Sequence, residues 1–464
     1  DEPAAAPAAV VVGAGPAGLA AALMLAQRGW QVTVLERTAD PTGYDPGRGF
    51  MYLIDGRGQA CLAALGPGLL GELRAASVSM AEARIGILTP KGMKEMTNPM
   101  KDAARESYWL PRHVFVGLLM AEAKSEPRIR LLFGAELESL QHEPGGAVEA
   151  RGKSAEEGEF HFSGQLLVGA DGIRSAVRQR MEQWDGGRGR FVPQKFDSPA
   201  AGLRYKVLTL PGNFSVGTTE GHKDLRSEVM YSVRGAAPSG AKLKMGLIPT
   251  SADYGTRTAN VITLPADDFW EVESPEELKA YAEKQWPHFP ISELVSEAEL
   301  QRFAADRGGY FPSPQHSPAA AWAPGAEQGG GAGAGAVLLG DALHAFPPDI
   351  GQGVNSALED VEVLRAALDA EGDARAAAAV LTFEQGRMPD VEALVQMIRV
   401  AAPFQYSQAP WRGRLWSASF LARLLLNKLL PKVFDLPAFM LVQRSEMPYR
   451  EVWRRGRQGA RRAA

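Results

Sequence analysis

The chain has a single cysteine, Cys61, among its 464 residues. One cysteine excludes a disulfide framework and a cysteine-rich metal site, and it fits a reducing compartment. The seven histidines show neither an HExxH motif nor the spacing of paired-cysteine zinc sites, so no metal is expected. A net charge of −4 gives the whole chain no electrostatic affinity for nucleic acid.

Long apolar runs are also missing, and without 18 consecutive apolar residues no ordinary membrane-spanning helix is expected. Charges and prolines interrupt the most apolar segment, 415–442, yet an apolar stripe can form there beside Arg423 and Lys428. The last 21 residues carry seven arginines and two glutamates. These features predict either a helix packed on the protein with a solvated tail, or contact with anionic lipid or a larger complex.

The location of the protein is a further expectation. The chain begins with Asp1 rather than Met, which leaves open the removal of a targeting peptide. We expect an organelle, either a chloroplast or a mitochondrion, with association to its membrane.

The length suits two or three domains, and 45% hydrophobic with 22% charged residues is a globular composition. Near the start, an apolar strand at 10–12, a helix at 19–28 and a strand at 31–35 form a strand–helix–strand unit of a parallel sheet. Short strand-like runs between about 185 and 310 predict an antiparallel sheet. A low-complexity run at 329–336 predicts a flexible connection, and the segments 356–368 and 376–387 predict helices. From 390 onward the pattern is mostly helical.

The turn in the first unit carries Gly13, Gly15 and Gly18 in a GxGxxG pattern. The first glycine permits the tight turn, the second lets backbone approach a pyrophosphate, and the third lets helix and strand pack closely. The helix N-terminus offers free N–H groups and partial positive charge to that anion. Glu36 ends the next strand at the spacing of a ribose-binding acid. The pattern therefore favours a dinucleotide site over an ordinary glycine-rich turn.

Two later apolar strands also end at an acid. Asp171 and Gly172 follow the first of them, where a helix cap with a solvated basic face is the simpler interpretation. Asp341 ends the second, and it can accept hydrogen bonds from a ribityl hydroxyl. Segment 351–354 then opens a helix whose N–H groups could face the O2/N1 side of an isoalloxazine ring. His344 fits a structural role better than that of a catalytic base.

Together the three motifs resemble the group A flavoprotein monooxygenases over nearly the whole chain. The resemblance implies FAD, NADPH or NADH as a transient reductant, O2, and hydroxylation of a small aromatic or carboxylate-bearing substrate through a flavin C4a-hydroperoxide. It also implies an α/β fold (α+β overall) with a Rossmann-like FAD-binding domain of the p-hydroxybenzoate hydroxylase type. The expected parts are the discontinuous FAD-binding domain at 1–75, 105–184 and 312–390, an antiparallel-sheet substrate domain at 76–104 and 185–311, and a C-terminal helical region with a basic tail at 391–464.

The motifs and the resemblance together predict the cofactor-binding residues, and Arg112 in particular comes from the resemblance. These residues are Gly13, Gly15, Pro16, Ala17, Gly18, Glu36, Arg37, Arg48, Arg112, Asp171, Gly172, Asp341, Gly351, Gln352, Gly353, Val354 and Asn355.

Within that family the chain is most similar to the kynurenine 3-monooxygenases. The segments that carry this similarity are Gly47-Arg48, Arg57-Gly58, Ala83-Arg84, Val354-Asn355 and Glu359-Asp360. The similarity implies catalytic or substrate-binding roles for Arg84, Tyr108 and Asn355, with Arg84 on a substrate carboxylate. The alternative for Arg84 is a surface arginine on a strand. Burial would favour the binding role, because a buried arginine without an anion is costly.

The chain also departs from that branch. Asp349 and Ile350 stand where two phenylalanines are usual beside the flavin, and a substrate-binding tyrosine is missing near Val400 or Ala401. We therefore keep the alternative of an FAD-binding protein that has lost hydroxylation and serves as a structural or redox subunit of a larger assembly. A third alternative is a lipid-handling relative of geranylgeranyl reductases or epoxidases, which would need a large apolar pocket.

Overall fold

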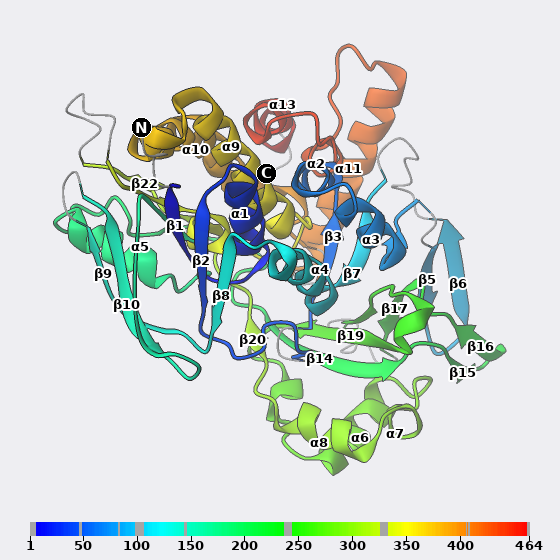
Figure 1. The fold of residues 1–464 in the computed structure, drawn as a ribbon. Helices are drawn as coiled ribbons and strands as arrows, with labels where there is room; N and C mark the ends of the chain where they lie inside the picture. The colour runs from blue at the N-terminus through cyan, green and yellow to red at the C-terminus, as the bar shows by residue number, and fades with distance from the viewer. Residues whose placement is uncertain are drawn as a thin grey trace.

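The computed structural model describes residues 6–45, 49–81, 84–97, 106–142, 146–235, 244–324, 333–404, 406 and 409–461. The first half of the chain supplies four strands of a six-stranded sheet with the order β22-β23-β12-β1-β2-β8, and residues after 320 supply β22 and β23 (Figure 1). Its strands run parallel except β22. Their bounds are β1 (Ala8–Val12), β2 (Gln31–Glu36), β8 (Ile129–Phe133), β12 (Leu166–Gly169), β22 (Ala321–Trp322) and β23 (Gly335–Leu338).

The inner strands β1, β12 and β23 are buried runs of apolar residues, as parallel strands with both faces covered require. In Figure 1 the helices α1, α9 and α10 lie behind the sheet, and β9 and β10 flank it. A three-stranded sheet consists of β9 (Glu136–His142), β10 (Val148–Ser154) and β11 (Gly158–Gly164). The helices of this half are α1 (Pro16–Gln27), α2 (Gly56–Leu65), α3 (Leu69–Ala75), α4 (Arg112–Ser125) and α5 (Ala176–Trp184).

A second sheet of seven strands has the order β20-β14-β19-β18-β17-β5-β6. It is antiparallel except that β5, which comes from a distant part of the chain, pairs in parallel with β17. The helices α6, α7 and α8 lie below it in Figure 1, over their own apolar core. The elements are β5 (Arg84–Leu88), β6 (Met93–Thr97), β14 (Arg204–Pro211), β17 (Met230–Arg234), β18 (Lys244–Leu247), β19 (Thr256–Thr263), β20 (Gly309–Tyr310), α6 (Pro275–Gln285), α7 (Ile291–Leu294) and α8 (Glu297–Ala305).

Three smaller sheets complete the described fold. A three-stranded sheet has the order β3-β7-β4, another has the order β13-β21-β24, and β15 pairs with β16. Their bounds are β3 (Met51–Ile54), β4 (Val78–Ser79), β7 (Tyr108–Pro111), β13 (Gln194–Lys195), β15 (Phe214–Thr218), β16 (Gly221–Leu225), β21 (Gln315–His316) and β24 (His344–Ala345), together with the 3-10 turns η3 (Ala252–Tyr254), η4 (Asp268–Glu271), η6 (Gly340–Ala342) and η7 (Asp373–Arg375).

From Gly353 onward the elements of the described chain are helical. Its helices are α9 (Gly353–Glu371), α10 (Ala376–Ala401), α11 (Pro410–Leu429), α12 (Ala438–Leu441) and α13 (Tyr449–Arg461). The sequence pattern predicted that α10 would end at Arg387, but the helix continues through Pro389. Proline removes one backbone hydrogen bond. Burial of Leu394, Met397 and Ile398 in a core shared with α12 and α13 compensates for that loss.

The predicted fold class is confirmed: an α/β flavin-type domain, a mostly antiparallel sheet and a helical C-terminal region are all present. The domain boundaries themselves stay a prediction. Gly335 and Ala336, expected in a flexible connection, already belong to the buried strand β23. Within the described ranges, no helix combines the length and apolar character needed to cross a membrane.

Candidate functional site

The glycine turn lies between β1 and α1. Gly13 has φ +105, and a Cβ there or on Gly18 would collide with neighbouring backbone. A Cβ on Gly15 would meet nothing within 4 Å, so the second glycine leaves open space beside the backbone. No side chain caps the N-terminus of α1, whose first helical residue is Pro16. This turn fits the pyrophosphate of a dinucleotide, because free N–H groups and a close backbone approach are what that anion requires.

Glu36 connects the glycine turn to the end of β2. Its carboxylate accepts hydrogen bonds from the backbone N–H groups of Ala14 and Thr38, both at 2.8 Å. The side chain is therefore held beside the turn, where a ribose-binding acid is expected. Arg37, the next residue, is exposed, and Ala17 is buried under the turn.

Asp341 lies at the carboxyl end of β23, in the turn after Gly340. The Asp341 side chain is accessible, yet the surrounding protein desolvates its carboxyl and raises the pKa, against the opposing charges of His344 and Arg112. Arg112 begins α4 and also acts on the hydroxyl of Tyr52. The structure thus brings Arg112 and Asp341, separated by more than 200 residues, to one place, as a site for a ribityl–phosphate chain requires.

Asp171 and Gly172 follow β12. One carboxylate oxygen of Asp171 accepts from the N–H groups of Ala176 (2.6 Å) and Val177 (3.2 Å) at the start of α5, and burial raises the pKa of Asp171. Arg178 is buried rather than solvated, and it donates to the carbonyl of Ala342 at 2.6 Å. This arginine therefore ties the segment after β12 to the segment that carries Asp341.

Helix α9 begins next to the turn that carries Asp341. Gly351 has φ +66, no side chain caps the helix, and a Cβ on Gly353 would meet nothing within 4 Å. These free N–H groups fit the predicted role beside a flavin ring. Val354 is buried, and the Gln352 side chain points away into a polar network, bonded to Asp55 at 3.0 Å.

The Asn355 amide is fully buried. It donates to the carbonyls of Leu53 (2.8 Å) and Gly351 (2.9 Å), and its oxygen accepts from the N–H of Asp55 at 3.0 Å. In this position Asn355 holds β3 against the start of α9. Its predicted catalytic role stays a prediction.

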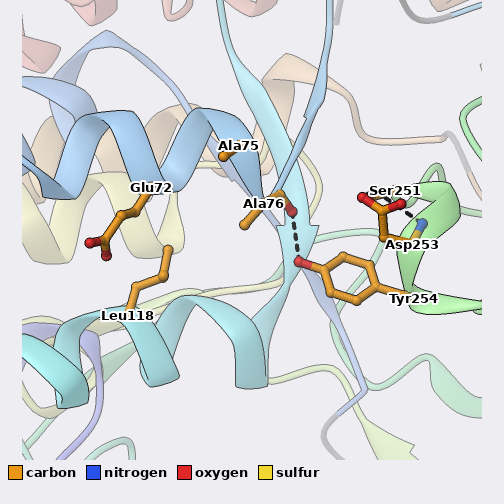
Figure 2. A pocket seen from close by; sticks show the side chains of 7 residues that line it. All are labelled: Glu72, Ala75, Ala76, Leu118, Ser251, Asp253 and Tyr254. Carbon is orange, nitrogen blue, oxygen red and sulfur yellow. Dashed lines mark hydrogen bonds between the residues drawn. The ribbon is translucent and has the colours of Figure 1, made fainter.

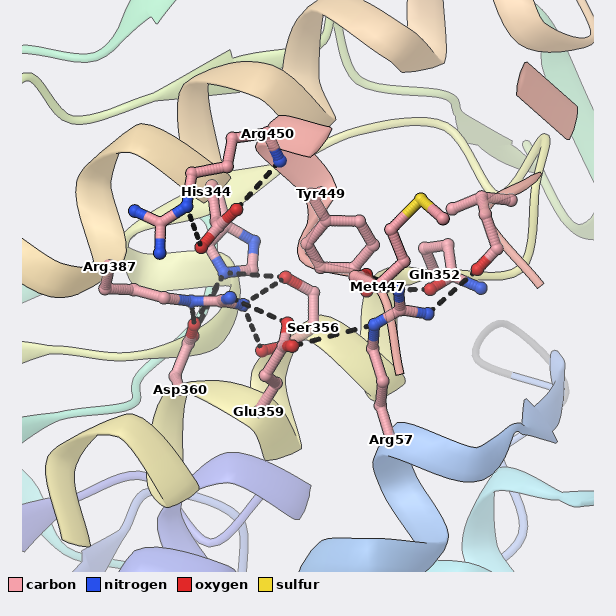
Figure 3. A network of polar contacts seen from close by, with 12 residues as sticks. Arg57, His344, Gln352, Ser356, Glu359, Asp360, Arg387, Met447, Tyr449 and Arg450 are labelled. Carbon is pink, nitrogen blue, oxygen red and sulfur yellow. Dashed lines mark hydrogen bonds and ion pairs between the residues drawn. The ribbon is translucent and has the colours of Figure 1, made fainter. Parts of the chain in front are cut away.

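A network of buried charges supports α9 from behind (Figure 3). Arg387 is 1% exposed and bonds Asp360 and Glu359, each at 2.7 Å. The Asp360 carboxylate also accepts from the Gly340 N–H at 2.7 Å and lies 3.0 Å from His344 Nε2, which places His344 in a structural position. Burial alone would raise the pKa of Asp360, but the charges of His344 and Arg387 outweigh burial and lower it.

The second half of this network joins α2 to the C-terminal region. Arg57 donates to the carbonyls of Val442 (2.8 Å), Arg444 (3.1 Å) and Met447 (2.7 Å), and its guanidinium lies 4.3 Å from the Tyr449 ring centroid. Tyr449 in turn donates to Gln352 Oε1 at 2.7 Å. The sequence analysis did not predict this network. The only available signal was charged residues inside apolar helical runs, since such residues are rarely buried unless paired.

Arg84 and Tyr108, the other two proposed substrate residues, lie on β5 and β7. Arg84 begins β5 with a side chain that is 52% exposed, and it pairs with Glu95 at 3.3 Å. The burial that would have favoured a binding role is thus absent. Tyr108 is buried on β7 and donates to Glu106 at 2.6 Å. Arg48 lies outside the described residues.

An aromatic cluster lies between the two sheets and the C-terminal region. Phe50 contacts Tyr205 (ring centroids 4.5 Å apart) and Phe311 (6.3 Å), and Phe311 contacts Tyr406 (5.6 Å). The Tyr406 hydroxyl interacts with the carboxylate of Asp349. The pKa of Tyr406 is raised well above its usual value, mainly because the hydroxyl is buried and also because of the negative charge of Asp349. Tyr406 therefore places a tyrosine in the aromatic cluster, a few residues after Val400 and Ala401, where the sequence analysis found a substrate-binding tyrosine missing.

A cavity of about 370 Å³ opens between α3, α4 and the turn η3 (Figure 2). Its lining consists of Glu72, Ala75, Ala76, Leu118, Ser251, Asp253 and Tyr254. The Tyr254 hydroxyl donates to the Ala76 carbonyl at 2.8 Å across it. None of the predicted site residues lines this cavity, so it is separate from the site built around the glycine turn.

Known proteins with similar sequences also indicate an FAD site around the glycine turn. Residues 7–198 and 332–398 match the FAD binding domain family. The chain is 29% identical over 452 residues to a kynurenine 3-monooxygenase of Salinispora arenicola (strain CNS-205), which covers 95% of this chain and 88% of that protein. It is 28% identical over 403 residues to a kynurenine 3-monooxygenase of Xanthomonas axonopodis pv. citri (strain 306), covering 83% of this chain and 77% of that protein.

Among solved structures, P. aeruginosa PqsL in complex with 2-aminobenzoylacetate superimposes with a TM-score of 0.60 at 20% identity, covering 87% of this chain and 97% of PqsL. This likeness supports the fold. The predicted resemblance to FAD-dependent monooxygenases of the kynurenine 3-monooxygenase kind is confirmed. With a family match over more than half of its length, and with a glycine turn, ribose acid and helix terminus that fit the cofactor, the chain belongs to the FAD binding domain family and FAD is its cofactor.

Proposed function

We propose that the protein is an FAD- and NAD(P)H-dependent monooxygenase that hydroxylates a small aromatic substrate with O2. The observation that carries this proposal is the convergence of three distant segments at the carboxyl edge of one parallel sheet. These are the turn at Gly13–Gly18, the Asp341–Arg112 pair, and the uncapped start of α9. Bound FAD would supply the electron transfer and the activation of oxygen that no side chain of the chain can supply.

The residues of the chain supply position and electrostatics. With FAD bound, the first N–H groups of α9 would stabilise the negative charge that the ring gains on reduction, because they are already oriented by the helix. Arg112 would offset the charge of Asp341 and of the FAD phosphates. Phe50, Phe311 and Tyr406 would help to exclude water from the substrate side of the ring. NADPH or NADH needs no domain of its own if it binds transiently.

Anaerobic stopped-flow reduction of the FAD-loaded protein by NADPH and by NADH, with and without kynurenine, tests this function. We expect reduction by at least one nucleotide, and faster reduction when an aromatic substrate is bound. Kynurenine is one candidate because both relatives named above are kynurenine 3-monooxygenases. Aerobic turnover with an oxygenated product would support hydroxylation. Failure of both nucleotides to reduce the flavin would overturn the proposal.

The second candidate is an FAD protein without hydroxylation, acting as a subunit of a larger assembly. The half-exposed position of Arg84 and the acid at Asp349 favour it, because both change the substrate side rather than the flavin side. Tightly bound FAD without NAD(P)H oxidation, together with co-purification in a complex, would support it.

We also propose peripheral contact of α11 with an anionic membrane surface, in the organelle expected from the sequence. Residues 410–432 contain five basic residues and no acid. The large apolar side chains that are exposed on this segment are Trp411, Leu415, Leu421, Leu425, Leu426, Leu429 and Leu430. Apolar side chains inserted among headgroups, with cations beside them, give the two attractive terms that such a helix needs.

Sedimentation with vesicles tests the membrane contact. We expect the protein to bind phosphatidylcholine vesicles only when phosphatidylserine is included, and to lose binding when Leu425 and Leu429 are both changed to glutamate. Matched changes of two exposed residues outside α11, Val192→Glu and Leu264→Glu, should leave binding intact. Vesicle-independent self-association through α11 would instead show a protein partner.

A further inference from the structure

The group that recognises the substrate is still unassigned, because Arg84 is remote from the aromatic cluster. Arg84 lies on β5 and Tyr205 on β14, and four strand-to-strand steps separate these strands in the sheet. At about 4.8 Å per step, the two strand axes are roughly 19 Å apart. A substrate with one aromatic ring cannot contact both. Arg84 is also already paired with Glu95.

The aromatic cluster, defined by Phe50, Tyr205, Phe311 and Tyr406, is next to the flavin-side residues instead. The Arg112 N–H donates to the Phe50 carbonyl at 3.2 Å, so the cluster begins where the predicted flavin arginine is anchored. On its other side Tyr406 reaches Asp349, two residues before Gly351 at the start of α9. The cluster therefore bridges the two segments between which a flavin ring would lie.

Among the described residues, Asp349 is the acid that interacts with Tyr406, and this aspartate is only 5% exposed. A buried carboxylate is costly unless hydrogen-bond donors or cations compensate it. The raised pKa of Tyr406 keeps its hydroxyl protonated, so it donates to the carboxylate. A carboxylate has about four acceptor positions, and one hydroxyl fills one of them.

We infer that Asp349, oriented by Tyr406, determines substrate specificity by accepting a hydrogen bond from an amino group on the aromatic ring that is to be hydroxylated. This inference rests on the proposed function and names its substrate class: aromatic amines, recognised by an acid, rather than aromatic acids recognised by Arg84. An aromatic carboxylate would be repelled by Asp349. A hydrogen bond to an ionised acceptor is about twice as strong as a neutral one, which makes the amino group the preferred partner.

The test uses the FAD-loaded protein and two single-ring probes, aniline and benzoate. Binding is followed by the change in flavin absorbance, and coupling by the stimulation of NADPH oxidation. We expect aniline to bind at least tenfold more tightly than benzoate. Asp349→Asn should weaken aniline binding roughly tenfold, the loss of one charge-assisted hydrogen bond, while benzoate binding improves. Asp224→Asn, an exposed acid on β16, is the matched control and should change neither constant.

Tyr406→Phe separates orientation from recognition. It should weaken aniline binding by a smaller factor and keep the preference for aniline, because the carboxylate remains. Tighter binding of benzoate than of aniline, or aniline binding that is indifferent to Asp349→Asn in a protein with full FAD content, would overturn the inference. Each variant is checked for FAD content first. If NADPH reduces the flavin while the probes give these contrary results, the specificity inference fails and the proposed function stands.

Discussion

Arg387 Nε lies 2.7 Å from Asp360 Oδ1, and both side chains are almost completely buried behind helix α9. Asp360 also accepts from the Gly340 N–H, so this ion pair holds the turn that presents Asp341. Figure 3 shows how the pair continues through Glu359 to Arg57 and Tyr449. The flavin-side segments thus rest on contacts that come from α2, α9, α10 and α13.

Removing Arg387 should therefore be strongly destabilising. Arg387→Ala leaves Asp360 buried without its cation, and we expect a loss of about 3–5 kcal/mol in the free energy of unfolding, measured with urea. Arg375→Ala, which breaks the exposed pair with Glu371, serves as the control and should cost less than about 1 kcal/mol. Equal effects of the two substitutions would contradict a supporting role for the buried pair.

Tyr449 should affect the flavin site without touching it. Tyr449→Phe removes the hydroxyl that donates to Gln352, which costs about 0.5–1.5 kcal/mol and loosens the start of α9. We expect FAD affinity, measured by quenching of flavin fluorescence, to fall several-fold. Tyr310→Phe, at an exposed tyrosine, should leave the affinity unchanged. An unaltered affinity in Tyr449→Phe would show that the C-terminal helix does not support the cofactor.

The glycine turn offers a matched pair of substitutions. A Cβ on Gly18 would collide with the Gly13 carbonyl, whereas Gly71 in α3 has free space and an ordinary φ. We expect Gly18→Ala to abolish measurable FAD binding. Gly71→Ala should retain it and stabilise the protein by up to about 1 kcal/mol, since alanine favours helix. If Gly18→Ala still bound FAD, α1 and β1 could move apart without loss of FAD binding, which would contradict the prediction.

His288 predicts a dependence of stability on pH. Burial lowers its pKa to about 4, so between that value and the ordinary 6.5 the unfolded chain binds a proton that the folded chain does not. The contribution to stability is complete above pH 6.5 and is lost as pH falls towards 4, by roughly 2–3 kcal/mol. Urea unfolding at pH 7 and pH 5 measures it. His288→Leu should flatten this slope, and the exposed His222→Leu should not.

Local features were predictable from the sequence because neighbouring residues decide them. Gly13 requires a positive φ wherever the turn lies, and an uncapped helix start follows from Gly15 and Pro16 alone. The order of the three motifs then identified a cofactor-binding edge. The extension of α10 past Pro389 was missed, because burial against α13 decides it rather than local propensity.

The sequence by itself determined where this protein turns its backbone towards an anion and which residues end its parallel strands, since both depend on local geometry. Only the tertiary structure decided that Arg84 is an exposed partner of Glu95, and that Tyr406 meets Asp349 across more than fifty residues. Whether a charge is buried, and with which partner, depends on how distant segments pack. For that reason the local geometry of the turns was predictable, and the partners of Arg84 and Tyr406 were not.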